Sequence, residues 1–157
     1  AADLAFSTSL SLPHYEAWKA TFPAAEWSHE FNRLLARLSG QYSLQAEILE
    51  HEQEFDLLLA LLQQHLSLYM MERFAPSFPE PYHDRIVACY LKIFAAEINK
   101  ASNRKQYRQL FNQLKILRRQ YSAQRQAMED FADEIRERYS DKPRRPALLE
   151  ELDRAGF

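Results

Sequence analysis

Glycine is almost absent from this chain, with only Gly40 and Gly156 among 157 residues. Average usage of about 7% would give roughly eleven glycines in a chain of this length. β-Barrels, sandwiches and glycine-rich phosphate loops need residues that adopt positive φ, so the shortage argues against all three. The nucleotide-binding motifs GxGxxG and GxxxxGKS/T cannot be written with these two glycines, which lie far apart in the sequence. A chain of helices is the architecture that tolerates this composition.

Apolar residues recur at helical spacing along nearly the whole sequence. Pro13 and Pro23 are placed where helices begin, and Gly40 is placed to end the helix that follows Pro23. Further helices are predicted at or near residues 55–62, 66–74, 82–100, 104–121, 124–139 and 148–152. The expected fold class is therefore all-α, with about eight or nine helices joined by short links.

Short polar residues and prolines mark where these helices start and stop. Ser43, Asn103 and Ser122 are predicted N-caps, because their side chains can accept hydrogen bonds from a first helical turn. Segment 76–81 holds three prolines and segment 143–146 holds two, so neither can propagate a helix. We expect one helical domain over residues 1–157, with a proline-rich connector at 76–81 and a Pro-Arg link at 143–146.

A recurring unit places apolar residues three, four and seven positions after an aromatic residue. It occurs at 31–38, 55–62 and 107–114. Stacked helical hairpins of α-solenoids produce such self-similarity. The first two units start 24 residues apart, closer than the 34-residue spacing of TPR proteins. The pattern predicts a degenerate, TPR-like array of antiparallel helices.

Features that would direct the chain to a membrane or a secretory route are lacking in the sequence. The longest apolar run, near 57–62, is far shorter than the roughly 20 residues of a membrane-spanning helix. The N-terminus lacks the pattern of a signal peptide and begins with Ala1 rather than Met. We expect a cytoplasmic piece of a longer protein with no membrane partner; a mature exported protein is the alternative. Cys89, the single cysteine, is expected to be buried in a helix.

No motif for catalysis or metal binding is found. Five histidines occur, but His51 and Glu52 are not followed by the second histidine of an HExxH site. One cysteine cannot form a thiolate zinc cluster, and no GxSxG nucleophile elbow is present. We therefore expect no metal, no cofactor and no enzymatic activity.

Charge is unevenly distributed although the formal net charge is −2. Residues 1–80 carry 4 basic and 11 acidic side chains, whereas residues 81–157 carry 16 basic and 11 acidic. No Asp or Glu occurs between Ile98 and Met128. On the helix predicted at 104–121, four cations fall within about 60° of arc beside the apolar stripe. This basic face consists of Arg104, Arg108, Lys115 and Arg119.

Two interpretations of the basic face stay open. It can be a binding surface for phosphates or for an acidic protein segment. It can also be a solvated flank that pairs with the acidic first half of the chain or with Glu129, Asp130 and Asp133.

Several short motifs resemble the C-terminal helical region of bacterial SWIM zinc-finger family proteins. The similar segments are NRKQY at 103–107, LKILR at 114–118, RPALLEELD at 145–153, PHYEAWK at 13–19, Trp27 and the run 46–49. The resemblance implies a TPR-like helical module at the end of a longer protein. Zinc and DNA binding by the finger are not carried over, because its CxC and CxH ligand motif is absent and Cys89 stands alone.

These observations favour a non-catalytic module for protein interaction or scaffolding, whose protein partner the sequence does not identify. The alternative is a nucleic-acid-associated module that uses the basic face of residues 100–125.

Overall fold

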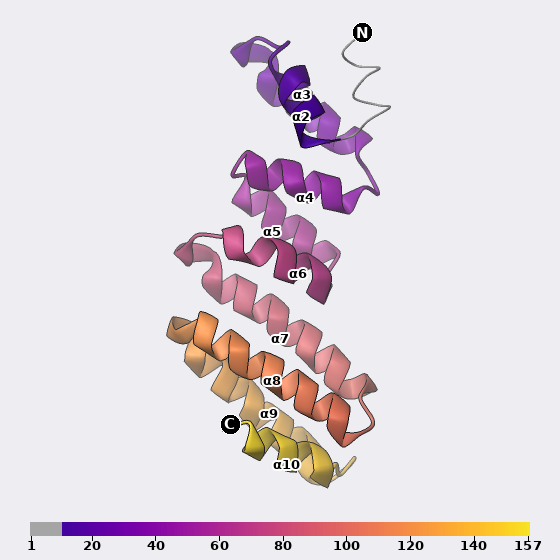
Figure 1. Cartoon of the computed structure of the whole chain (residues 1–157), viewed down its shortest axis with the longest axis vertical. Coiled ribbons are helices and arrows are strands. Elements are labelled where there is room, and N and C mark those ends of the chain that lie inside the picture. The colour runs from indigo at the N-terminus through magenta and orange to yellow at the C-terminus, as the bar shows by residue number, and fades with distance from the viewer. Residues whose placement is uncertain (1–10) are drawn as a thin grey trace. The chain divides into compact units, whose positions relative to one another are not determined.

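The computed structural model describes residues 11–157, and its regular elements in that range are all helical (Figure 1). They are nine α-helices, labelled α2 to α10, and three short 3-10 helices, η1 to η3. No strand occurs in the described range, which confirms the all-α prediction. The expectation about a signal peptide falls on the N-terminus, and residues 1–10 lie outside the described residues.

The chain divides into two compact units, Ala1–Ser77 and Phe78–Phe157. The first unit contains α2 (Leu12–Lys19), α3 (Ala24–Arg37), α4 (Tyr42–His51), α5 (Phe55–Gln64), α6 (Leu68–Phe74) and η1 (Ala75–Ser77). Within it, α4 packs against α2, α5 and α6. The helices bury their apolar stripes there, including Tyr15, Leu34, Ile48, Leu58 and Met71.

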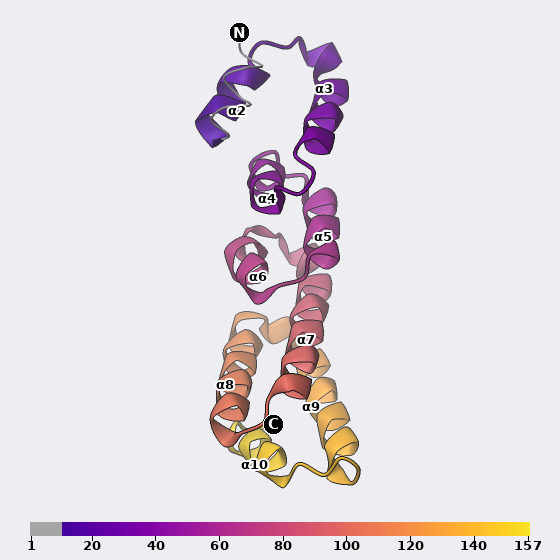
Figure 2. The ribbon, with the colours of Figure 1, turned by 90° about the vertical axis from the view of Figure 1, so that its right-hand side faces the viewer.

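The second unit contains η2 (Glu80–Tyr82), α7 (His83–Lys100), α8 (Arg104–Gln120), η3 (Ser122–Gln124), α9 (Arg125–Ser140) and α10 (Pro146–Arg154). Helices α7, α8 and α9 reverse direction one after another and pack on each other (Figures 1 and 2). Helix α10 packs against α8 and α9. Cys89 is buried in α7, as predicted.

Several predicted helix ends are confirmed. Pro13 lies in the first turn of α2, and Pro23 directly precedes α3. Gly40 has φ of +87°, which favours glycine, and it follows the end of α3. The Asn103 side chain accepts a hydrogen bond from the Gln106 backbone N–H at 3.0 Å and caps α8.

Two predicted caps are wrong. Ser43 lies inside α4, which begins one residue earlier, and its hydroxyl donates to the Met70 sulfur at 3.9 Å. Ser122 begins η3 instead of capping a helix, and α9 starts only at Arg125 without a side-chain cap. In both places the serine lies inside the helical turn instead of directly before it, so its side chain does not cap unpaired N–H groups.

The predicted proline breaks coincide with interruptions of the α-helices. Segment 76–81 overlaps η1 and η2, and the boundary between the compact units falls inside it. The single domain expected over residues 1–157 stays a prediction. Link 143–146 leads into α10, whose first residue is Pro146, and the Arg145 guanidinium donates to the carbonyl of Ile98 at 2.8 Å. That bond ties the link to the end of α7.

Candidate functional site

The basic face predicted from the sequence lies on α8. The opposite side of this helix is buried and holds Tyr107, Phe111, Leu114 and Leu117. Burial of that stripe leaves the basic flank at the surface, where Arg104, Arg108 and Arg119 are exposed and Lys115 is half-buried. The structure thus brings the four cations to one side of one helix.

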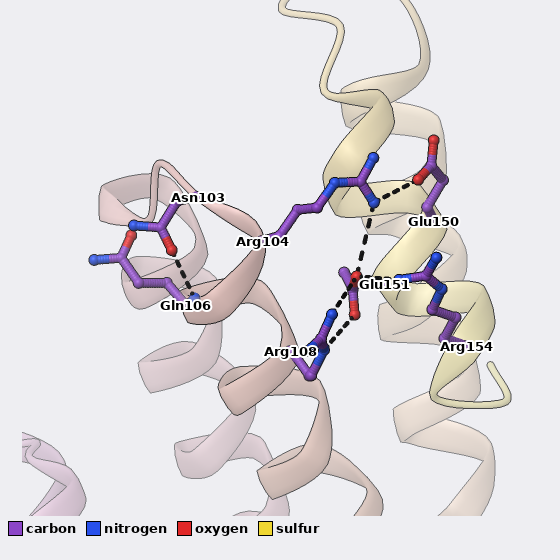
Figure 3. Close-up of polar contacts among 7 residues, drawn as sticks. All are labelled: Asn103, Arg104, Gln106, Arg108, Glu150, Glu151 and Arg154. Atoms are coloured by element: carbon purple, nitrogen blue, oxygen red, sulfur yellow. Dashed lines mark hydrogen bonds and ion pairs between the residues drawn. The ribbon is translucent and has the colours of Figure 1, made fainter.

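Two of the four cations are bound to α10 (Figure 3). Arg108 donates to both carboxylate oxygens of Glu151, from Nε at 3.0 Å and from Nη2 at 3.2 Å. Arg104 pairs with Glu150 at 2.5 Å and lies 3.7 Å from Glu151. Arg154, one turn further along α10, donates to Glu151 at 2.6 Å. We call these five residues the Glu151 cluster.

Electrostatics keep the carboxylates of this cluster ionised. The side-chain hydrogen bond from Arg108 lowers the pKa of Glu151, against the opposing effect of burial. The hydrogen bond from Arg104 lowers the pKa of Glu150 in the same way. Because only 2% of Glu151 is exposed, its charge depends on these guanidinium partners. The cluster therefore fastens α10 to α8.

The other two cations of the basic face remain without such partners. Within residues 11–157, Lys115 and Arg119 make no ion pair or side-chain hydrogen bond. Neighbouring Arg118, which is not part of the basic face, pairs with Glu129 at 2.9 Å. The basic face is thus divided: its first half is occupied by α10, and its second half faces solvent.

A pocket of about 270 Å³ lies beside the Glu151 cluster. It is lined by Arg108, Phe111, Asn112, Glu151, Arg154 and Ala155. Two guanidinium groups and one carboxylate leave a surplus of one positive charge at its walls. A pocket with this lining suits a small anionic group better than an apolar one.

A second pocket, of about 420 Å³, lies in the first unit between α2 and α3. It is lined by Glu16, Lys19, Ala20, Phe22, Ala24 and Trp27. The ring centroids of Trp18 and Trp27 are 5.8 Å apart and those of Trp18 and Phe22 are 4.7 Å apart, and both pairs pack edge to face to support the wall. The pocket combines an apolar wall with a charged rim, which is typical of a site for a large side chain.

A polar network beside this pocket fixes Lys19. Both Glu52 oxygens accept hydrogen bonds from Lys19 Nζ at 2.7 Å, and Tyr15 donates to Glu52 at 2.8 Å. Burial alone would raise the pKa of Glu52, but the hydrogen bonds from Lys19 and Tyr15 outweigh it and lower the pKa. Burial and the Glu52 hydrogen bond raise the pKa of Tyr15. The Lys19 ammonium is also 5.1 Å from the Trp27 ring centroid, so it covers one aromatic face.

Sequence reasoning missed Glu52 and the Glu151 cluster partners. The i,i+3 spacing of Glu151 and Arg154 was a readable signal of a local ion pair. Contacts across 43 residues of sequence, such as Arg108 with Glu151, have no local signal. For the pocket between α2 and α3 the sequence offered only Tyr15 and Trp18 on one side of α2, because Phe22 lies after the end of that helix.

The described part of the chain offers no metal site and no membrane span. Among residues 11–157, no three His, Cys, Asp or Glu side chains are grouped closely enough to hold a metal ion. None of the helices in that range has the length and apolar character needed to cross a bilayer. No protein-family model, curated protein or solved structure matches the chain.

Proposed function

We propose that this chain is a non-catalytic helical module for protein interaction or scaffolding, built as a TPR-like array of antiparallel helices. It is a piece of a longer cytoplasmic, bacterial protein of the SWIM zinc-finger family. The short motifs that resemble that family and the recurring aromatic-apolar units support this proposal. Reversal of direction between α7, α8 and α9 is consistent with stacked helical hairpins.

The observation that carries the proposal is the pocket between α2 and α3. Phe22 and Trp27 give it an apolar wall, and Glu16 and Lys19 give it a polar rim. Hot spots of protein interfaces are large apolar or aromatic side chains that enter such pockets. Its volume of about 420 Å³ accommodates an anchor residue of a partner helix or strand.

The polar clusters of the chain favour binding over catalysis. Glu52 and Glu151, two carboxylates with little exposure, are each held ionised by cationic partners. A general acid or base needs a pKa near the working pH, whereas both of these pKa values are lowered. Neither carboxylate is thus suited to proton transfer, and each one joins neighbouring helices.

A substitution that fills the pocket tests the proposal. A random peptide library displayed on phage is selected against the purified chain, and the selected peptides are measured on two variants. Ala24→Trp places an indole in the pocket, whereas Ala25→Trp places it on an adjacent exposed position outside the lining. We expect selected peptides to carry a large apolar residue and to lose about tenfold in affinity for Ala24→Trp only. Failure to select any peptide, or equal binding to both variants, would contradict the proposal.

The second candidate is a nucleic-acid-associated module, favoured by three cations of α8, which are the exposed Lys105 and Arg119 and the half-buried Lys115. Two features weaken it. First, Arg104 and Arg108 are already paired with carboxylates of α10. Second, Tyr107 and Tyr121 are buried, so these two rings do not stack on bases.

A further inference from the structure

We propose that the exposed face of α8 binds an acidic segment of a partner protein that carries an apolar anchor residue. This inference rests on the proposed interaction function, but it uses residues unrelated to the pocket between α2 and α3. The surface, called the α8 outer face, consists of Lys105, Asn112, Lys115, Ile116 and Arg119.

Helical spacing places these residues along one strip. Asn112 follows Lys105 by two turns, Lys115 and Ile116 follow Asn112 by one, and Arg119 follows them by one more. The strip avoids the buried stripe of α8, which includes Phe111, Leu114 and Leu117, so it is not part of the core.

The charge of this strip is uncompensated among residues 11–157. In the part of the chain that the structure describes, Lys105, Lys115 and Arg119 form no ion pair, and α8 itself contains no Asp or Glu. Arg104 and Arg108 on the same helix are neutralised by Glu150 and Glu151. Cations of α8 thus already bind two consecutive carboxylates of another helix, Glu150 and Glu151 of α10.

Ile116 adds an apolar contact to the strip. About 53% of this residue is exposed, one of few large hydrophobic side chains at the surface of the described residues. An apolar residue framed by cations suits a peptide in which carboxylates flank a leucine or similar side chain. A phosphate backbone would gain nothing from Ile116 and would meet only three unpaired cations.

The pocket beside the Glu151 cluster extends the strip. Asn112 belongs to both, because its side chain lines the pocket of about 270 Å³. The Glu151 cluster as a whole holds three guanidinium groups against two carboxylates, so one positive charge is left over, and Arg108 and Arg154 of this cluster line the pocket. A partner carboxylate can therefore enter the pocket and accept from guanidinium N–H groups, while the rest of the segment follows α8 toward Arg119.

The experiment uses a fluorescein-labelled synthetic peptide in which glutamates flank one leucine, with the full chain as binder. A second peptide replaces each Glu by Gln, and a single-stranded DNA oligonucleotide is measured in parallel. Fluorescence anisotropy at about 0.15 M salt gives the affinities. We expect Lys115→Gln/Arg119→Gln to lower the affinity for the glutamate peptide about tenfold, because each exposed ion pair contributes up to about fivefold in affinity. Ile116→Ser alone should weaken it by a smaller factor.

A matched control removes the same charge elsewhere. Lys92 and Arg144 are exposed in the second unit, so Lys92→Gln/Arg144→Gln should leave affinity for the glutamate peptide within about twofold. All substituted positions lie at the surface, and circular dichroism verifies that each variant remains helical.

Three results would overturn the proposal. The first is equal affinity for the Glu and Gln peptides, and the second is an equal loss of peptide affinity in both double variants. The third is that DNA binds more tightly than the peptide and that Lys115→Gln/Arg119→Gln weakens DNA binding. The last result would instead establish the nucleic-acid function. If the peptide fails but the Ala24→Trp contrast holds, the α8 proposal fails alone and the interaction function stands.

Discussion

Glu52 and Glu151 each connect two helices through ion pairs and hydrogen bonds. Glu52 directly follows α4 and is reached by Lys19 and Tyr15 of α2, whereas Glu151 of α10 is reached by Arg108 of α8. In each case one carboxylate joins two helices through charge-assisted hydrogen bonds, which are stronger than neutral ones. Arg108 was predicted from the sequence as part of the basic face, whereas Lys19 and both carboxylate partners were not, because pairing over 33 or 43 residues is decided by packing.

Glu52→Gln should destabilise the protein by about 1–2 kcal/mol at neutral pH, because the hydrogen bonds from Lys19 and Tyr15 would then lack a charged acceptor. The folded-state pKa of Glu52 is lowered, so its contribution is present above the unfolded pKa and is lost as pH falls through the folded pKa. Urea unfolding at a series of pH values should show that the difference in free energy of unfolding between wild type and variant shrinks below about pH 4.5.

Glu54→Gln is the matched control for this prediction. Glu54 is exposed and forms no ion pair among the described residues, so its substitution should change stability by less than about 0.5 kcal/mol at every pH. If the difference in free energy of unfolding between wild type and Glu52→Gln does not vary with pH, the stabilising role of the Glu52 carboxylate charge is contradicted.

At the scale of elements, helical periodicity was sufficient to place most helices but not to place every cap. The helices predicted at 82–100 and 104–121 begin and end within one residue of α7 and α8. Their apolar stripes are long and regular, so burial and local propensity agree. The two serine caps failed because capping depends on backbone conformation. Asn103 is extended, with φ −140° and ψ 161°, whereas Ser122 lies within a 3-10 turn.

Asn103→Ala should therefore cost about 0.5–2 kcal/mol of stability, because the Gln106 backbone N–H loses its acceptor. Ser122→Ala should cost less than about 0.5 kcal/mol, because no side-chain cap is lost there. Chemical denaturation of the two variants side by side measures both values. An equal cost for the two would show that the distinction drawn from the backbone is mistaken.

At the scale of the whole molecule, the break in α-helix at segment 76–81 was predictable, because proline cannot continue an α-helix beyond its first turn. The division into Ala1–Ser77 and Phe78–Phe157 was not predictable, because it depends on which helices pack their apolar faces against each other. Amphipathic helices of similar composition offer many pairings, and only packing selects among them. The Glu151 cluster and the α2–α3 pocket follow from the selected pairings, which is why neither was predicted.

The second unit should fold by itself. Residues 78–157 contain complete helices α7 to α10, whose buried side chains pack among themselves, including Ile86, Phe94, Phe111, Ile135 and Leu152. A domain of about 80 residues buries more than half of its unfolded surface, which is enough for a stable core. Expressed alone, this fragment should give a helical circular dichroism spectrum and one cooperative thermal transition.

A shorter fragment, residues 101–157, provides the control for autonomous folding. It lacks α7, which packs on both α8 and α9, so the buried faces of those two helices would meet water. Exposed apolar stripes cost about 25 cal/mol for each Å² left unburied, and isolated helices of this length are marginal in water. We therefore expect little helix and no cooperative transition from the shorter fragment. If residues 78–157 are also unfolded alone, the chain is one domain, as expected from the sequence.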